Sequence, residues 1–305
     1  MRSRPPFPRR GFALMAVLWC VGIMTVVVGG LVGYVSLQLD ETVALAQDAQ
    51  ARNLALSGLA LGLHPLVKRD DPLLSEKIGP GRSCVVTIEG EDARLNLNSL
   101  LASNRADILE RVWVRWGLSA DEARSLDDCL ADWIEPGDLR RLNGAKREQY
   151  ARLGHPEYPP GRPFQTLEEV VQVIGFGKVE KLHPNWRNAF TLWSDGKLDL
   201  NEADADLIAA VCGVGLPAAE AFVERRDPQG RKGDPDGAHP QSVEEAASLL
   251  GMSGIDFRQA APILTVNGTL WRIASTATVD RHRHTVVVVA PRTGTDSGYY
   301  LWQEF

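Results

Sequence analysis

Few side chains of this 305-residue sequence are spaced for catalysis. It contains no HExxH zinc motif, no GxSxG nucleophile turn and no phosphate-binding loop. His282 and His284 alternate, so they would share one face of a strand, where they could bind a metal ion. We favour a polar flank of a β-hairpin as the interpretation of this pair. We therefore expect that the chain is not an enzyme.

Two glycine-containing segments have the form of phosphate-binding hairpins. Gly213-Val214-Gly215 and Gly175-Phe176-Gly177-Lys178 fit the helix–hairpin–helix template, in which hairpin N–H groups and lysines hold phosphates. A membrane-anchored chain with this module resembles the competence DNA receptors, which is the alternative function. However, residues 196–237 contain five Lys and Arg against nine Asp and Glu, whereas a phosphate-binding surface should be basic. We therefore expect these glycines to serve close backbone packing, and no nucleic acid as a partner.

Composition and charge exclude several classes of protein. The chain is 44% hydrophobic and 24% charged, which excludes collagen-like, wholly disordered and disulfide-dense proteins. Its net charge is −6, and four arginines lie before residue 11, so the rest of the chain carries −10. A strongly acidic body argues against nucleic acid as the main partner. The four cysteines form no CxxC pair, and the sequence leaves open whether Cys129 and Cys212 form a disulfide.

The first sixty residues predict one long helix. Residues 12–39 carry no charge, and at ~1.5 Å per residue they can span the ~30 Å hydrocarbon core of a bilayer. The four arginines before them place the short N-terminus in the cytoplasm. The run is about twice as long as the apolar region of a secretory signal, and no proline follows it until Pro65. We expect a helix of roughly fifty residues whose second half is amphipathic, with a buried stripe of Leu45, Ala49, Arg52, Leu56, Leu59 and Leu63.

The middle of the chain contains an internal repeat of helical units. Segments 93–112 and 197–226 each consist of a short apolar stretch, an asparagine and a helix, and we expect Asn98 and Asn201 to be helix N-caps. A capping box follows in each unit, with the pairs Thr166 and Glu169, and Ser242 and Glu245. Residues 131–163 are rich in proline, glycine, asparagine and charge, which predicts a long ordered loop over the helical core.

Strand patterns flank this helical region on both sides. Residues 83–89 alternate between apolar and polar before Gly90, and residues 269–279 and 284–291 bracket a tight polar connection. Residues 299–305 predict a last aromatic strand. The sequence therefore predicts an α+β fold in which the long helix packs on an antiparallel sheet. A large all-α domain is inserted between the strands of that sheet.

The N-terminal pattern resembles the type IV pilin-like proteins. Arg9-Arg10-Gly11 stands directly before the apolar run, and in that family a prepilin peptidase cuts after this glycine. The resemblance implies cleavage between Gly11 and Phe12 and N-methylation of Phe12. The family's usual glutamate at the fifth mature position is replaced here by Ala16. Among the pseudopilins of type II secretion, the K subunit characteristically lacks this glutamate.

Matches to this K-type minor pseudopilin extend over nearly the whole chain. They are the junction of residues 11 and 12, ARLNLNSLL, CLADWIEPGD, PFQTLEEVVQVIGF, KLDLNEADADLIAAV and the strand-rich C-terminus. The implied parts are a leader over 1–11, a transmembrane assembly helix over 12–39, the first part of a pilin-like domain over 40–92, an inserted helical domain over 93–266 and C-terminal strands over 267–305.

The resemblance also implies a place and partners. The chain would cross the inner membrane once, keep its body in the periplasm and stand at the tip of the pseudopilus, where it starts or limits assembly. Expected partners are the I-, J- and H-type minor pseudopilins, the major pseudopilin and the prepilin peptidase. In the assembly helix, Ala16 cannot supply the usual charge, and small residues such as Gly22 and Gly29 are expected to contact other helices.

Calcium is the one cofactor that the sequence leaves open. Members of this family can bind calcium in the helical domain and tend to carry Asn-Gly-Ala-Glu, whereas this chain has the segment 143–146 with Lys146 in place of the acid. Asp132, Glu135 and Asp138 could still supply the oxygen atoms that a hard cation requires. A solvated acidic loop is the simpler interpretation of these three residues.

Overall fold

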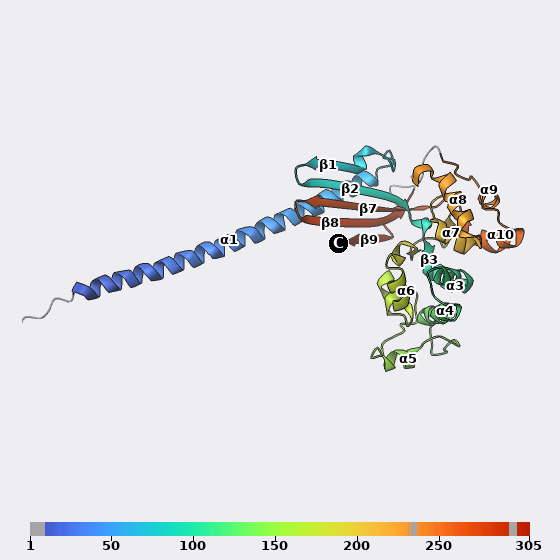
Figure 1. Ribbon diagram of the computed structural model, residues 1–305, viewed down its shortest axis with the longest axis horizontal. Coiled ribbons are helices and arrows are strands. Elements are labelled where there is room, and N and C mark those ends of the chain that lie inside the picture. Colours follow the sequence, from blue (N-terminus) through green and yellow to red (C-terminus); the bar gives the residue numbers. More distant parts are fainter. Residues whose placement is uncertain (1–9, 231, 233–236, 293–297) are drawn as a thin grey trace, which may run out of the picture.

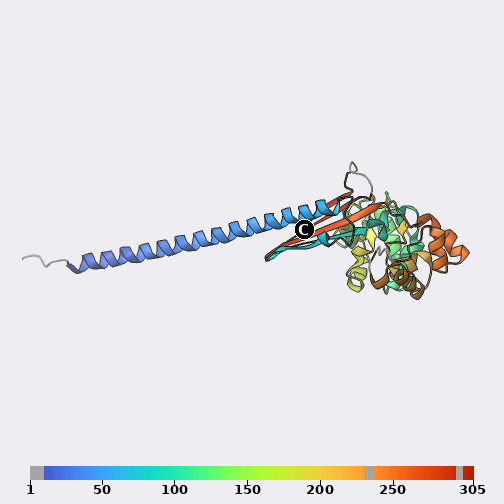
Figure 2. The same cartoon turned by 90° about the horizontal axis from the view of Figure 1, so that it is seen from above.

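A long helix, a sheet and a helical block follow one another in the molecule (Figure 1). The computed structural model describes residues 10–230, 232, 237–292 and 298–305, with only the backbone described at 10–13 and 229. Helix α1, Arg10–Gly62, is one unbroken helix of 53 residues, as the absence of proline between Pro8 and Pro65 predicts. Its first half extends far from the rest of the molecule, and its second half lies on the sheet (Figures 1 and 2).

The sheet has five antiparallel strands in the order β1-β2-β7-β8-β9. Four of them confirm the predicted strands, and β1 was not predicted because all five of its residues are exposed and show no apolar alternation. β7 and β8 form a tight hairpin at Asp280. Its φ of +54° is positive, as two-residue hairpin turns require. The strands are β1 Ser75–Gly79, β2 Arg82–Gly90, β7 Leu270–Val279, β8 His282–Pro291 and β9 Leu301–Glu304.

The second half of α1 packs closely on β2, β7 and β8. The expected stripe is wrong in its first half, because Leu45, Ala49 and Arg52 are exposed. The buried line instead consists of small residues and one leucine. The small residues let the helix backbone approach the strands closely. These helix residues are Ala51, Ala55, Gly58, Leu59 and Gly62.

The helical block is inserted between β2 and β7, which are neighbours in the sheet. It has its own hydrophobic core, built around Trp113, Trp133 and Trp186, all of which are almost fully buried. The predicted α+β fold with an inserted all-α domain is confirmed. The helices are α2 Leu97–Ala102, α3 Ala106–Arg115, α4 Ala120–Ile134, α5 Arg147–Arg152, α6 Phe176–Leu182, α7 Ala205–Cys212, α8 Leu216–Arg226, α9 Val243–Leu249 and α10 Gly254–Ala260.

The internal repeat corresponds to two units, each closed by a short parallel strand pair. In the first unit β3 (Leu95–Asn96) pairs with β4 (Phe190–Thr191), and in the second β5 (Leu198–Asp199) pairs with β6 (Leu264–Thr265). The backbone therefore returns to its starting point at the end of each unit. Since both ends of the block lie beside the sheet, the insertion does not separate β2 from β7.

The capping predictions were only partly right. Asn98 and Asn201 are not N-caps, because Asn96 caps α2 and Asp204 occupies the cap position of α7. Ser242 does cap α9, and its hydroxyl accepts a hydrogen bond from the backbone N–H of Glu245. The segment after Thr166 is a 3₁₀ helix, Leu167–Gln172, without a side-chain cap. There Glu169 binds Arg162 instead.

Candidate functional site

The first half of α1 is an apolar surface without a partner inside the described chain. Its side chains from Leu14 to Leu39 are exposed, including Trp19 at 70%, and Ala16 lies in the same surface. Among the described residues, α1 is the one helix long and apolar enough to cross a membrane, with a mean hydropathy of 2.4 over its most apolar window. A Cβ added at Gly22 or Gly29 would meet no other described part of the chain within 4 Å, so these positions are open to another helix.

The proposed processing site lies at the beginning of this helix. Gly11 and Phe12 belong to the first turn of α1, where the structure describes only the backbone. Residues 1–9, which contain most of the expected leader, are also outside the described part of the chain.

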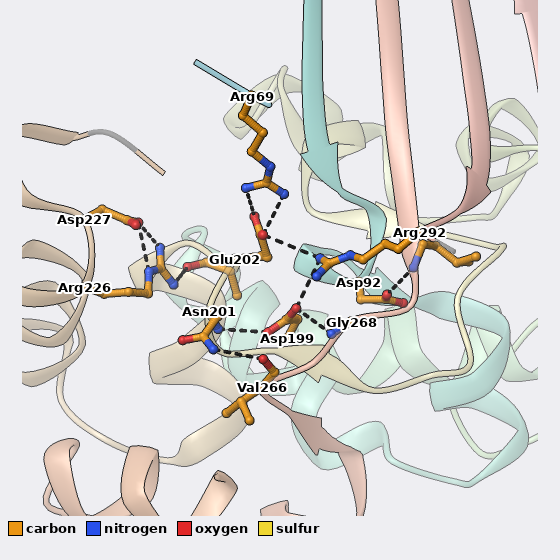
Figure 3. A network of polar contacts seen from close by, with 12 residues as sticks. Arg69, Asp92, Asp199, Asn201, Glu202, Arg226, Asp227, Val266, Gly268 and Arg292 are labelled. Carbon is orange, nitrogen blue, oxygen red and sulfur yellow. Dashed lines mark hydrogen bonds and ion pairs between the residues drawn. The ribbon is translucent and has the colours of Figure 1, made fainter. Parts of the chain in front are cut away.

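A network of buried polar groups joins the sheet to the helical block (Figure 3). The Asp92 carboxylate, on the chain leaving β2, accepts hydrogen bonds from the backbone N–H groups of Thr269 (2.6 Å) and Leu270 (3.0 Å). Asp199 of β5 accepts one from Gly268 N–H (2.8 Å). Burial raises the pKa of both carboxyl groups, and these backbone hydrogen bonds oppose the rise. The segments that lead into and out of the block are thereby tied together.

Two arginines extend this network to the surface of the sheet. Arg69 and Arg292 lie over the Trp271 ring, with their guanidinium carbons 4.1 and 4.0 Å from its centroid. Both arginines pair with Glu202 of the helical block, Arg69 at 2.6 Å and Arg292 at 3.5 Å. These groups line an open cleft of about 760 Å³ at the end of α1. Their arrangement fixes how the helical block sits relative to the sheet.

The three carboxylates of the acidic loop do not converge. Asp132 is fully buried near the end of α4, and its carboxylate accepts hydrogen bonds from Arg141 N–H at 3.2 and 3.3 Å. Glu135 forms an ion pair with the Arg141 guanidinium, and Asp138 is exposed. No group of three metal-ligating side chains occurs within the part of the chain that the structure describes. Burial raises the pKa of Asp132, and the hydrogen bond from Arg141 opposes the rise.

The glycine hairpin does have the geometry of a helix–hairpin–helix. Gly213 ends α7 in the left-handed conformation and Gly215 is the N-cap of α8. Arg111, which lies beside the end of α7, donates to the carbonyl oxygen of Ala210 (2.6 Å) and pairs with Asp107. Arg226 is fully buried and donates to Asp227 and to two backbone carbonyls (Figure 3), while Asp256 lies beside Gly213. In the other glycine segment, Lys178 is paired with Glu122 at 2.6 Å.

The cysteines form no disulfide. All four are free, and Cys84, Cys129 and Cys212 are buried. Burial raises the pKa of Cys129 and of Cys212 to about 12, so these thiols are unreactive at neutral pH. The pairing of Cys129 with Cys212, which the sequence left open, is therefore not present.

Comparison with known proteins points to one family. Residues 93–184 match the family described as type II secretion system (T2SS), protein K. A relative in Pseudomonas aeruginosa, "Type II secretion system protein K", is 25% identical over 250 residues, covering 73% of this chain and 74% of its own length. In fold, the chain is similar to a solved chain from the GspK-GspI-GspJ complex of enterotoxigenic Escherichia coli, with a TM-score of 0.63 and 21% identity over 88% of this chain and 98% of that chain.

Proposed function

Because this chain is a relative of type II secretion system protein K, we propose that it is a minor pseudopilin whose role is packing rather than catalysis. The observation that carries this proposal is the exposed apolar half of α1, which projects away from a folded body and has no partner in the described chain (Figure 2). In an assembly, this half is held first by the inner membrane and then by the corresponding helices of other pseudopilins.

The chemistry of processing is carried by residues 9–12. A prepilin peptidase cuts between Gly11 and Phe12 and methylates the new N-terminus of Phe12. The residue at the fifth mature position is Ala16, which has no charge to pair with the N-terminus of a neighbouring subunit. The body lies on the periplasmic side, because the four arginines before residue 11 stay in the cytoplasm.

The position proposed for this subunit is the tip of the pseudopilus. The helical block lies beyond the end of the sheet that is farthest from the apolar half of α1 (Figures 1 and 2). A further subunit added above along the direction of α1 would meet this block, which would limit growth. The solved complex from Escherichia coli combines GspK with GspI and GspJ. We propose I- and J-type minor pseudopilins as the subunits directly below this chain, with the H-type and the major pseudopilin farther down.

The test is the intact mass and N-terminal sequence of the full chain, expressed with and without a prepilin peptidase. We expect a chain that begins at methylated Phe12 only when the peptidase is present. Gly11→Leu should keep the leader and abolish secretion, while Gly22→Leu, as a matched control for processing, should still be cleaved. A wild-type chain that keeps its leader in both cases would be a plain membrane anchor, and the DNA-receptor alternative would then be tested by DNA binding.

A further inference from the structure

Lys146 is a buried lysine at the end of a helix. Its side chain reaches the C-terminus of α4, where the last carbonyl groups of a helix have no partner within the helix. The Lys146 Nζ donates hydrogen bonds to the carbonyl oxygens of Asp132 (2.6 Å) and Glu135 (2.7 Å). The residue is only 4% exposed. Backbone carbonyl oxygens that converge in this way are also ligands for a bound calcium ion.

We propose that the ammonium group of Lys146 takes the place of a bound divalent cation in the 131–163 loop. This loop then folds on the helical core without any metal ion, in contrast to the calcium binding that the family resemblance leaves open. The lysine supplies the positive charge from within the chain, at the negative end of the α4 dipole.

Several groups near Lys146 are already engaged by other parts of the chain. The carboxylate of Asp132 accepts from Arg141 N–H, and a Cβ added at Gly144 would collide with this carboxylate. Glu135 is paired with the Arg141 guanidinium. In the same turn, the carbonyl oxygen of Trp133 accepts a hydrogen bond from Gly161 N–H at 3.2 Å.

Cationic side chains already stand at this site. The carboxylates of Asp128, Asp132 and Glu135 all act on Arg141, and Lys146 lies near Asp132. A divalent ion bound to the same two carbonyl oxygens would have to occupy nearly the same place as the ammonium nitrogen, whose positive charge would repel it strongly. The ion and the Lys146 ammonium group therefore exclude one another.

The direct test needs no substitution. Thermal unfolding of the full chain in detergent micelles would be measured with a chelator and with roughly millimolar calcium, together with calorimetric titration of calcium. We expect the same Tm in both conditions and no saturable heat of binding. A Tm that rises by several degrees with calcium, with a rise that is lost in Asp132→Asn, would overturn the proposal.

Two variants test the role of the lysine itself. Lys146→Met should lower the Tm by about 3–10 °C, because two buried carbonyls lose their donor, and calcium should not restore it. Lys146→Glu should lower the Tm in chelator and regain part of it with calcium, because the cation position is then vacant. The exposed Lys181→Met serves as the matched control and should change neither value. A Lys146→Glu chain indifferent to calcium would contradict the assignment of this position to a cation.

Discussion

The side-chain amide of Asn98 and the main chain of Phe164 exchange two hydrogen bonds, each of 2.9 Å. Asn201 makes related bonds in the second unit, from its Nδ2 to the carbonyl oxygens of Pro240 (3.0 Å) and Val266 (2.9 Å). Phe164 and Pro240 each lie two residues before the cap of the following helix. Each asparagine therefore fixes the segment that leads into the next helix of its own unit, although the loops between them differ in length.

Replacing Asn98 should destabilise the helical block. In Asn98→Ala the buried N–H and carbonyl of Phe164 lose their partners together, and each unmade hydrogen bond costs about 1–3 kcal/mol. We expect a loss of about 2–4 kcal/mol in the free energy of unfolding, measured by denaturant titration of the full chain in micelles.

Two related variants check this explanation. Asn201→Ala should show a loss of similar size, because it also releases two main-chain groups. Asn185→Ala changes an exposed asparagine and should stay within about 0.5 kcal/mol of the wild type. Equal stability of the Asn98 and Asn185 variants would show that the Phe164 bonds contribute nothing.

A second prediction concerns the packing of α1 on the sheet. At Gly58 an added Cβ would lie 2.5 Å from the Cys84 sulfur and still closer to the Ser275 hydroxyl. Gly58→Ala should therefore lower the free energy of unfolding by about 1–3 kcal/mol, although alanine favours a helix by up to ~1 kcal/mol in an open position. The measurement is the unfolding midpoint of the full chain.

The control for this prediction is Gly22→Ala in the same helix. No described atom outside the helix lies within 4 Å of a Cβ at Gly22, so this substitution should be neutral or slightly stabilising. If both variants were stabilised alike, the close approach of α1 to β2 and β7 would have no energetic consequence.

Much of this fold could be predicted because its elements carry strong local patterns. The uninterrupted run to Pro65 predicts α1, and the alternation in 83–89 and 284–291 predicts β2 and β8. The face that α1 buries could not be predicted, because leucines dominate the helical pattern while Ala51, Ala55 and Gly58 make the contact. Which side chain lies inside depends here on how closely the backbones approach, and a pattern drawn from large apolar side chains carries no signal for that.

The sites were predicted less completely than the elements. The carboxylates at 132, 135 and 138 were identified by residue type. Their spacing along the chain does not show that Arg141, rather than a metal ion, contacts Asp132 and Glu135. The network of Asp92, Asp199 and Arg292 was missed altogether, because its members come from segments about a hundred residues apart. In the acidic loop, the one signal in the sequence was Lys146, a basic residue where the family resemblance implies an acid.

A third prediction tests the link between the sheet and the helical block. Asp92→Ala removes the acceptor for Thr269 N–H and Leu270 N–H, where the chain enters β7. Hydrogen exchange of these two amides should become at least about tenfold faster, since a lost bond of about 1.4 kcal/mol corresponds to that factor. Exchange at Val288 in the middle of β8 should not change. The exposed Asp121→Ala is the control, and slow exchange at Thr269 and Leu270 in the Asp92 variant would show that another contact protects them.

The last prediction concerns the dependence of stability on pH. Asp127 is buried in the helical block, where its Oδ1 accepts a hydrogen bond from Trp113 Nε1 at 2.7 Å and its Oδ2 has no partner among the described residues. Burial raises the pKa of this carboxyl from 3.8 to about 8, and the bond from Trp113 only partly opposes the rise. Between these two pKa values the folded chain keeps a proton that the unfolded chain has released. Stability should therefore fall as the pH rises from about 4 to 8.

Asp127→Asn isolates this contribution. The asparagine keeps an oxygen that accepts from Trp113 Nε1, and it cannot ionise. The contribution of Asp127 to the change of stability with pH, at most about 1.4 kcal/mol per pH unit, should therefore disappear. A smaller slope should remain, because burial also raises the pKa of Asp92 and Asp199. The measurement is the free energy of unfolding of both chains between about pH 5 and 8. The wild type should lose stability relative to the variant as the pH rises, and two parallel curves would mean that Asp127 is already ionised in the folded chain.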